Sequence, residues 1–133
     1  MADTPQQIPF FAESVPAGFP SPTMGEINGT LDLNQLCVRH PAATYYVRAR
    51  GNSMTGAGID DGDILVVDRS LEHTHGSIVI AAISGEFTVK KLEQRNGKHC
   101  LVPANPDYAP VEITQDQMAD IFGVVTFVIR QLQ

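Results

Sequence analysis

Beyond residue 43 the sequence is a succession of short apolar runs separated by turns, and this pattern constrains the fold more than any other feature. Each run either alternates apolar with polar residues or is apolar throughout, as β-strands do. Asp61-Gly62-Asp63, Ser84-Gly85 and Asn96-Gly97 supply residues suited to tight turns. We therefore expect a mainly β fold of antiparallel strands. The expected strands cover residues 45–50, 64–67, 78–83, 87–92, 99–102, 111–113 and 122–129.

The first 29 residues differ from the rest because they are rich in proline, at positions 5, 9, 16, 20 and 22. Proline has no backbone N–H, so this segment suits neither a regular helix nor a central strand. It also contains apolar residues that favour burial, among them Phe10, Phe11 and Phe19. The sequence predicts an extended arm over residues 1–29, lying on a surface or in a groove, and a compact body over residues 30–133.

One short helix is expected between the arm and the strands, over about residues 31–39. Leu33, Leu36 and Cys37 recur at helical spacing, and Thr30 or Asp32 can cap the helix start. Pro41 limits the helix at its other end.

Composition excludes several classes of protein. The chain has 133 residues, which suits one domain, and a net charge of −6. An acidic chain lacks the basic face that strong binding to nucleic acid requires. The two cysteines, Cys37 and Cys100, cannot form a disulfide framework or a cysteine zinc site, and they fit a reducing compartment. No signal peptide or membrane-spanning run is visible, so we expect a cytoplasmic protein.

Ser53 stands in an unusual setting, Gly51-Asn52-Ser53-Met54, directly after an expected strand. Gly51 permits a sharp backbone turn, and a serine exposed there can have backbone N–H groups beside it that stabilise a developing oxyanion. The backbone amides of Asn52 and Ser53 are the candidates for this role. The alternative is an ordinary polar loop serine.

A nucleophilic serine needs a base, and lysine is a better candidate here than histidine. The four histidines lie at a helix end or in polar loops, where solvated side chains are expected, and His73-Thr74-His75 lacks a third metal ligand. Lys90 and Lys91 interrupt an apolar strand and point to opposite faces. An inward lysine is desolvated, which lowers its pKa towards the range of a general base. Strand alternation alone does not show which of the two lysines points inward. The alternative to a general base is a lysine that protects an exposed sheet edge from aggregation.

Three motifs together resemble the UmuD-like branch of the LexA-like self-cleaving serine peptidases. They are Ala17-Gly18-Phe19-Pro20-Ser21-Pro22 in the arm, Gly51-Asn52-Ser53-Met54 at the turn and Phe87-Thr88-Val89-Lys90-Lys91-Leu92 in a hairpin. Further similarity extends over nearly the whole chain, from residue 14 to residue 129. The resemblance implies a compact antiparallel β domain of the LexA and signal-peptidase type, with no cofactor and no metal.

The resemblance also implies roles for individual residues. Ser53 is similar to the nucleophile, Lys90 to the general base, and Ala17-Gly18 to the scissile bond. Only seventeen residues precede Gly18, too few for a DNA-binding domain, so a repressor is not expected.

The implied function is self-cleavage in the bacterial SOS response to DNA damage. A RecA filament on single-stranded DNA would stimulate the reaction, and the shortened homodimer would join a UmuC-like polymerase in translesion synthesis and SOS mutagenesis. The alternative is a regulatory binding module that acts on a polymerase or RecA without cleavage.

Overall fold

The computed structural model describes residues 6–11, 14–17 and 27–133 and divides the chain into two compact units, Met1–Cys37 and Val38–Gln133. In the first unit, β1 (Ile8–Phe11) pairs antiparallel with β2 (Ile27–Leu31), and α1 (Leu33–Cys37) follows. This pairing was not expected for a proline-rich segment. It is compatible with Pro9, which lies opposite Thr30, because neither strand of a two-stranded ribbon is central. The boundary at residues 29 and 30 stays a prediction.

The predicted short helix is confirmed, although it is shorter than expected. Asp32 caps it: its Oδ1 accepts hydrogen bonds from the backbone N–H groups of Asn34 at 2.9 Å and Gln35 at 3.4 Å. Within the described residues, no helix is long and apolar enough to cross a membrane.

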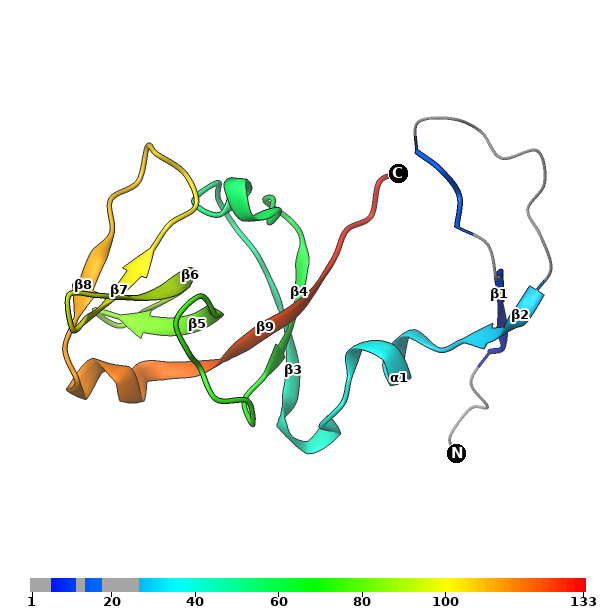
Figure 1. The fold of residues 1–133 in the computed structure, drawn as a ribbon, viewed down its shortest axis with the longest axis horizontal. Helices are drawn as coiled ribbons and strands as arrows, with labels where there is room; N and C mark the ends of the chain where they lie inside the picture. The colour runs from blue at the N-terminus through cyan, green and yellow to red at the C-terminus, as the bar shows by residue number, and fades with distance from the viewer. Residues whose placement is uncertain (1–5, 12–13, 18–26) are drawn as a thin grey trace. The chain divides into compact units, whose positions relative to one another are not determined.

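The second unit is a seven-stranded antiparallel sheet, which confirms the predicted mainly β fold (Figure 1). The strands are β3 (Thr44–Arg48), β4 (Ile64–Asp68), β5 (Ile78–Ile83), β6 (Glu86–Arg95), β7 (Lys98–Val102), β8 (Val111–Ile113) and β9 (Ile121–Ile129). Three short 3₁₀ helices accompany them, η1 (Pro41–Ala43), η2 (Thr55–Ala57) and η3 (Asp116–Asp120).

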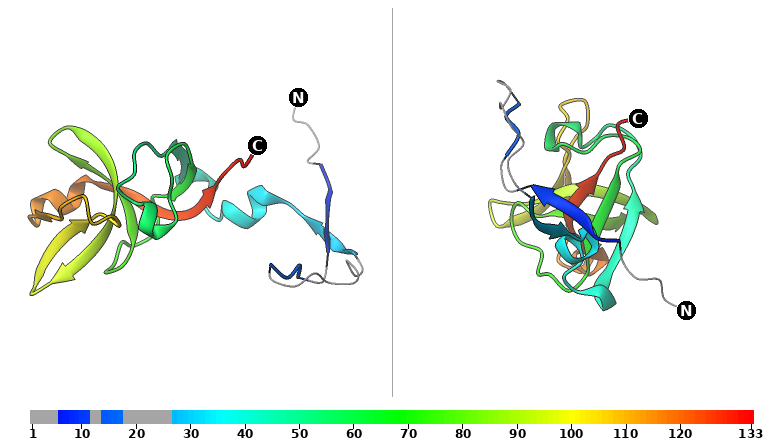
Figure 2. Two further views of the ribbon diagram at one scale, coloured as in Figure 1. Left: turned by 90° about the horizontal axis from the view of Figure 1, so that it is seen from above. Right: turned by 90° about the vertical axis from the view of Figure 1, so that its right-hand side faces the viewer.

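The order of the strands in the sheet is β3-β4-β9-β5-β6-β7-β8. Tight turns at Ser84-Gly85 and Asn96-Gly97 connect β5 to β6 and β6 to β7, and all four turn residues have positive φ, as a type I′ hairpin requires. The last strand, β9, lies between β4 and β5. Figures 1 and 2 show β9 running along the second unit, so that it pairs with β5 near its start and with β4 towards its end.

Two clusters of buried apolar side chains stabilise this sheet. Successive residues of a strand point to opposite faces, so Ile80 belongs to one cluster while Val79 and Ala81 belong to the other. The first cluster also contains Met54 and Ile59, which are each only 2% exposed. These two residues anchor the loop that begins at Ser53 to the core, so the core positions the loop.

Candidate functional site

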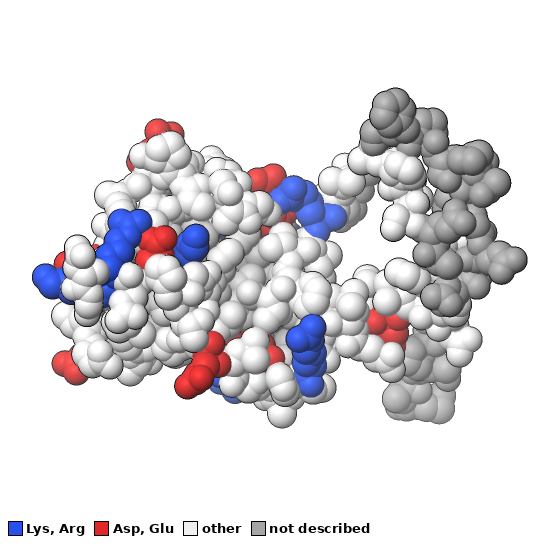
Figure 3. Space-filling view, viewed as in Figure 1, with Lys and Arg blue, Asp and Glu red and all other residues white. Residues whose placement is uncertain are grey.

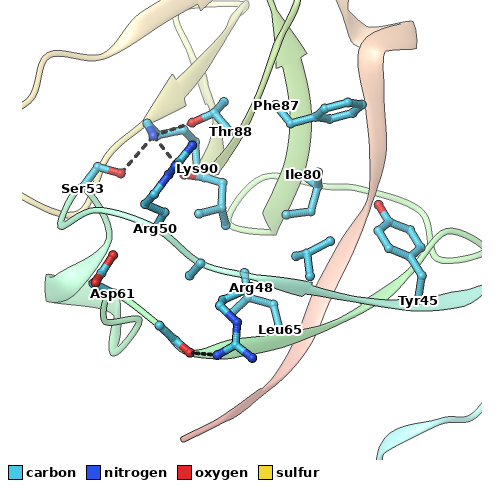
Figure 4. Close-up of a pocket in the computed structure, with 14 residues that line it drawn as sticks. Tyr45, Arg48, Arg50, Ser53, Asp61, Leu65, Ile80, Phe87, Thr88 and Lys90 are labelled. Carbon is cyan, nitrogen blue, oxygen red and sulfur yellow. Dashed lines mark hydrogen bonds between the residues drawn. The ribbon is translucent and has the colours of Figure 1, made fainter.

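Ser53 and Lys90 meet in the structure, although 37 residues separate them in the chain. The Nζ of Lys90 lies 3.0 Å from the Oγ of Ser53 (Figure 4). Ser53 lies at the turn after β3, and Lys90 lies in the middle of β6. Strand alternation alone did not show which of the two lysines points inward. In the structure, Lys90 is the one that contacts Ser53.

The Lys90 amine has two further hydrogen-bond partners. Its Nζ lies 2.7 Å from Thr88 Oγ1 and 3.0 Å from the carbonyl oxygen of Val89. A neutral amine has two N–H bonds and one lone pair. If Thr88 and Val89 accept the two N–H bonds, the lone pair faces the Ser53 hydroxyl. This arrangement suits the transfer of a proton from Ser53 to Lys90.

The surroundings of Lys90 favour its neutral form. The side chain is half-buried, and desolvation by this burial lowers the pKa of the amine from its ordinary value of 10.5. The shift has the direction that a general base near neutral pH requires. No shift of this kind is needed for Ser53, since its proton leaves only as the reaction occurs.

The backbone before Ser53 makes a tight turn that depends on glycine. Gly51 has φ +89°, in the left-handed region where other residues are strained. Its N–H donates a 2.8 Å hydrogen bond to the carboxylate of Asp61. Asp61 thus connects the two ends of the loop between β3 and β4. Sequence reasoning had assigned Asp61 only to a turn, because nothing near it in the chain indicates its partner.

A cleft of about 830 Å³ leads to the Ser53–Lys90 pair. Its apolar lining comes from β3, β4, β5 and β6 and includes Val47, Leu65, Ile80 and Val89. Tyr45 and Phe87 also line it, and Phe87 is 70% exposed (Figure 4). A largely apolar cleft with a few polar groups is the usual form of a binding site. Here the polar and charged lining residues are Arg48, Arg50, Ser53, Asp61, Thr88 and Lys90.

Two of the histidines make contacts that the sequence did not indicate. The Nδ1 of His40 lies 2.6 Å from the buried carboxylate of Asp68, and the Nδ1 of His75 accepts a hydrogen bond from the N–H of Gln94. Both of these side chains are exposed, as expected for solvated histidines, while His73 and His99 are half-buried. In the part of the chain that the structure describes, no group of three or more His, Cys, Asp or Glu side chains is placed to hold a metal ion.

The predicted cleavage site lies in the first unit and is only partly described. Ala17 is exposed. Gly18, the other residue of the predicted scissile bond, lies outside the described residues. Ala17-Gly18 therefore stays a prediction, as does the oxyanion role of the Asn52 and Ser53 amides.

The charged side chains are mixed in sign. On the face shown in Figure 3, lysine and arginine side chains of the described residues lie among aspartate and glutamate side chains, with uncharged surface between them. Such a surface differs from the continuous basic area with which proteins bind the nucleic acid backbone.

Comparisons with known proteins agree with the expected family. The model of the Peptidase S24-like family matches residues 9–126. Protein MucA of Salmonella typhimurium is 51% identical over 120 residues, which cover 90% of this chain and 82% of that protein. Protein ImpA of Escherichia coli is 47% identical over 92% of this chain and 83% of that protein.

A more distant relative is LexA repressor 1 of Pseudomonas syringae pv. tomato, which is 39% identical over 88% of this chain and 58% of the repressor. The family match covers most of the chain, and the similarity to MucA and ImpA confirms the predicted UmuD-like resemblance. The chain belongs to the Peptidase S24-like family.

Proposed function

We propose that this protein is a peptidase that cleaves its own chain between Ala17 and Gly18, with Ser53 as nucleophile and Lys90 as general base. The observation that carries the proposal is the 3.0 Å distance between Lys90 Nζ and Ser53 Oγ, combined with the desolvation of the amine. A binding module without catalysis would not need a half-buried lysine at this distance from a serine.

The chemistry follows from these two groups. Neutral Lys90 takes the hydroxyl proton of Ser53 as Oγ attacks the carbonyl carbon of Ala17. The tetrahedral intermediate collapses, the amine of Gly18 leaves with the proton from Lys90, and an ester joins Ala17 to Ser53. Water, deprotonated by Lys90, then hydrolyses the ester and releases residues 1–17. No metal or cofactor takes part.

We infer that the cleft takes an extended peptide with small residues at the reacting bond. β3 is an edge strand of the sheet and contributes residues to the cleft, so an extended segment can lie beside it and form backbone hydrogen bonds. Alanine and glycine at the scissile bond allow the carbonyl carbon to approach Ser53 closely. Because substrate and catalyst belong to the same protein, a high effective concentration contributes to the rate.

The biological setting is proposed from the family. We infer that the protein acts in the bacterial cytoplasm during the SOS response, where a RecA filament on single-stranded DNA stimulates cleavage. The product, residues 18–133, would act as a homodimer with a UmuC-like translesion polymerase. Direct contact with nucleic acid is not part of the proposal, in keeping with the acidic charge of −6.

Self-cleavage can be tested with the purified full chain. The wild-type protein is incubated at alkaline pH, or with RecA, an ATP analogue and single-stranded DNA, and the products are identified by mass spectrometry. We expect a fragment that begins at Gly18 from the wild type and none from Ser53→Ala. A wild-type chain that stays intact, or a Ser53→Ala variant that is cut equally fast, would support the binding module instead.

The pH dependence of the rate follows from the lowered pKa of Lys90. The amine acts as a base only when it is neutral, so the rate of self-cleavage rises with pH through the pKa of Lys90 in the folded protein. Since burial lowers this pKa, the midpoint is expected below 10.5, the value of an ordinary lysine. The measurement is the first-order cleavage rate from pH 6 to about 11 in low salt. A midpoint at or above the ordinary value would contradict the assignment.

Thr88→Val should slow self-cleavage at the pH plateau by about 10-fold. The substitution keeps the shape of the side chain but removes the oxygen that lies 2.7 Å from Lys90 Nζ, so the amine is held less firmly beside Ser53. Gel-based rates measured alongside Thr88→Ser, which keeps the oxygen, test this expectation. An equal loss of cleavage rate in Thr88→Val and Thr88→Ser would show that the Thr88 hydroxyl does not contribute to the rate.

A further inference from the structure

The segment that follows β7 holds the turn at Ser53 by three hydrogen bonds. The Ala104 N–H donates to the Ser53 carbonyl at 2.8 Å, and the Gly56 N–H donates to the Ala104 carbonyl at 2.7 Å. The side-chain Nδ2 of Asn105 donates to the Asn52 carbonyl at 2.8 Å. These bonds join two parts of the chain about fifty residues apart, so the local sequence around Ser53 does not indicate them.

The Asn105 bond helps to set the direction of the Ser53 N–H. The peptide between Asn52 and Ser53 is trans, as are all the described peptide bonds, so its C=O and its N–H point in opposite directions. With the Asn52 carbonyl directed at Asn105, the Ser53 N–H points away from Asn105. Among the hydrogen bonds of the described residues, none is donated by this N–H. It is available to a substrate oxygen.

Asn105 is itself held in place. Its Oδ1 accepts a 2.9 Å hydrogen bond from the N–H of Asp107, and the side chain is half-buried. The Asn52 carbonyl has two longer bonds as well, from Thr55 Oγ1 at 3.2 Å and from the Thr55 N–H at 3.4 Å. Asn105 therefore supplies the shortest of the three bonds that orient this peptide, and it is the one bond that comes from a distant part of the chain.

We propose that Asn105 is a positioning residue that fixes the Asn52–Ser53 peptide, so that the Ser53 N–H stabilises the oxyanion formed when Ser53 attacks its substrate. This inference rests on the proposed function and deepens it. A preorganised backbone N–H is effective in this role because it needs no reorientation during the reaction. Asn105 does not contact the substrate; it acts through the peptide that it holds.

Two variants separate this role from a purely structural one. Asn105→Asp keeps the oxygen that accepts from Asp107 but replaces the donor to Asn52 by an oxygen, whereas Asn105→Ala removes both groups. If Asn105 orients the peptide, both variants lower the plateau rate of self-cleavage by about 10-fold or more, and the uncharged Asn105→Ala leaves the pH midpoint of Lys90 unchanged. If Asn105 only stabilises its own turn, through the bond from the Asp107 N–H, Asn105→Asp cleaves at the wild-type rate, and the proposal is wrong.

A second measurement does not depend on the arm. A fluorophosphonate probe reacts when Ser53 Oγ attacks phosphorus, fluoride leaves and the serine proton passes to Lys90, and the phosphoryl oxygen needs the same N–H donor. We expect the wild type to be labelled at least 10-fold faster than Asn105→Asp. Equal labelling rates would overturn the inference even if the wild type cleaves itself. A wild type that is labelled but does not cleave would contradict the proposed self-cleavage and leave the labelling contrast as support for the role of Asn105.

Both measurements require folded variants. Thermal unfolding of Asn105→Asp and Asn105→Ala, compared with the wild type, establishes that the body is intact at the assay temperature. Asp107→Ala is the matched control. It keeps the backbone N–H of residue 107, which donates a hydrogen bond to Asn105 Oδ1, and removes only an exposed carboxylate. It should cleave at the wild-type rate, and a 10-fold loss in this control would contradict a specific role of the Asn105 amide.

Discussion

Lys90→Ala should reduce the rate of self-cleavage by about 10²–10⁴-fold, the contribution typical of a general base, while Lys91→Ala should leave it within about 3-fold of the wild type. The two lysines are neighbours on β6, but only the Nζ of Lys90 lies within hydrogen-bond distance of Ser53. The comparison removes one lysine side chain from the same strand in each case, so it controls for strand stability. First-order rates of appearance of the Gly18 fragment, at the pH plateau of the wild type, provide the measurement.

Two outcomes would contradict the assignment of the base. A Lys91→Ala variant that loses as much activity as Lys90→Ala would indicate that β6 as a whole, rather than one amine, is required. A Lys90→Ala variant that still cleaves with a pH midpoint like that of the wild type would show that another group takes the proton of Ser53. Thermal unfolding of both variants is measured in parallel, because a buried alanine in place of a long side chain can also loosen the strand.

Asp63→Asn should lower the melting temperature of the protein by about 10 °C. Asp63 is 2% exposed, and its two carboxylate oxygens accept hydrogen bonds from Arg130 Nε at 2.8 Å and Nη2 at 2.7 Å. A third bond comes from the N–H of Asp60 at 2.7 Å. These bonds join the end of β9 to the loop that carries Ser53. Replacing the carboxylate by an amide breaks the ion pair and leaves a guanidinium facing an N–H₂ group.

The same ion pair predicts the stability of the protein in acid. The hydrogen bonds from Arg130 and Asp60 lower the pKa of Asp63 from 3.8 to about 2. A carboxyl with a lowered pKa contributes stability above its unfolded pKa, and this contribution is lost as the pH falls from 3.8 through about 2. Asp60→Asn is the matched control, because Asp60 is 53% exposed and its oxygen lies 3.4 Å from Arg130. It should change the melting temperature by less than about 2 °C, and a larger change than that of Asp63→Asn would contradict the prediction.

Local sequence predicted the secondary structure of the body because each signal acts over a few residues. The turns at Ser84-Gly85 and Asn96-Gly97 both form hairpins, and the expected strands are present, since positive φ and alternating side chains are properties of neighbouring residues. The pairing of β1 with β2 was not predicted. The proline content of the arm argued against strands, but a two-stranded ribbon exposes an edge on each strand and so accepts Pro9.

The candidate site was predicted in its members but not in its geometry. Ser53 stood out because of the glycine turn before it, and the lysine pair stood out because charged residues interrupt an apolar strand. Alternation restricted the two lysines to opposite faces, and the resemblance to the family indicated Lys90. Asp61 and Asn105 were not recognised as parts of the site, because the groups that they contact become neighbours only through loop packing. Thr88 was not recognised either, although it lies two residues before Lys90 on the same face of β6, so strand alternation could have indicated it.

The amino-acid sequence by itself determined the family, the antiparallel β character of the body and the residue types available for chemistry, because these depend on composition, spacing and short-range backbone preferences. The tertiary structure alone decided that the Lys90 amine lies within hydrogen-bond distance of Ser53, how this amine is desolvated and how the turn at Ser53 is held. The insertion of β9 between β4 and β5 determines how the sheet assembles, and the pairing of β6 within that sheet positions Lys90. Desolvation and hydrogen-bond geometry depend on atoms brought together from the whole body, and no short segment of the chain contains that information.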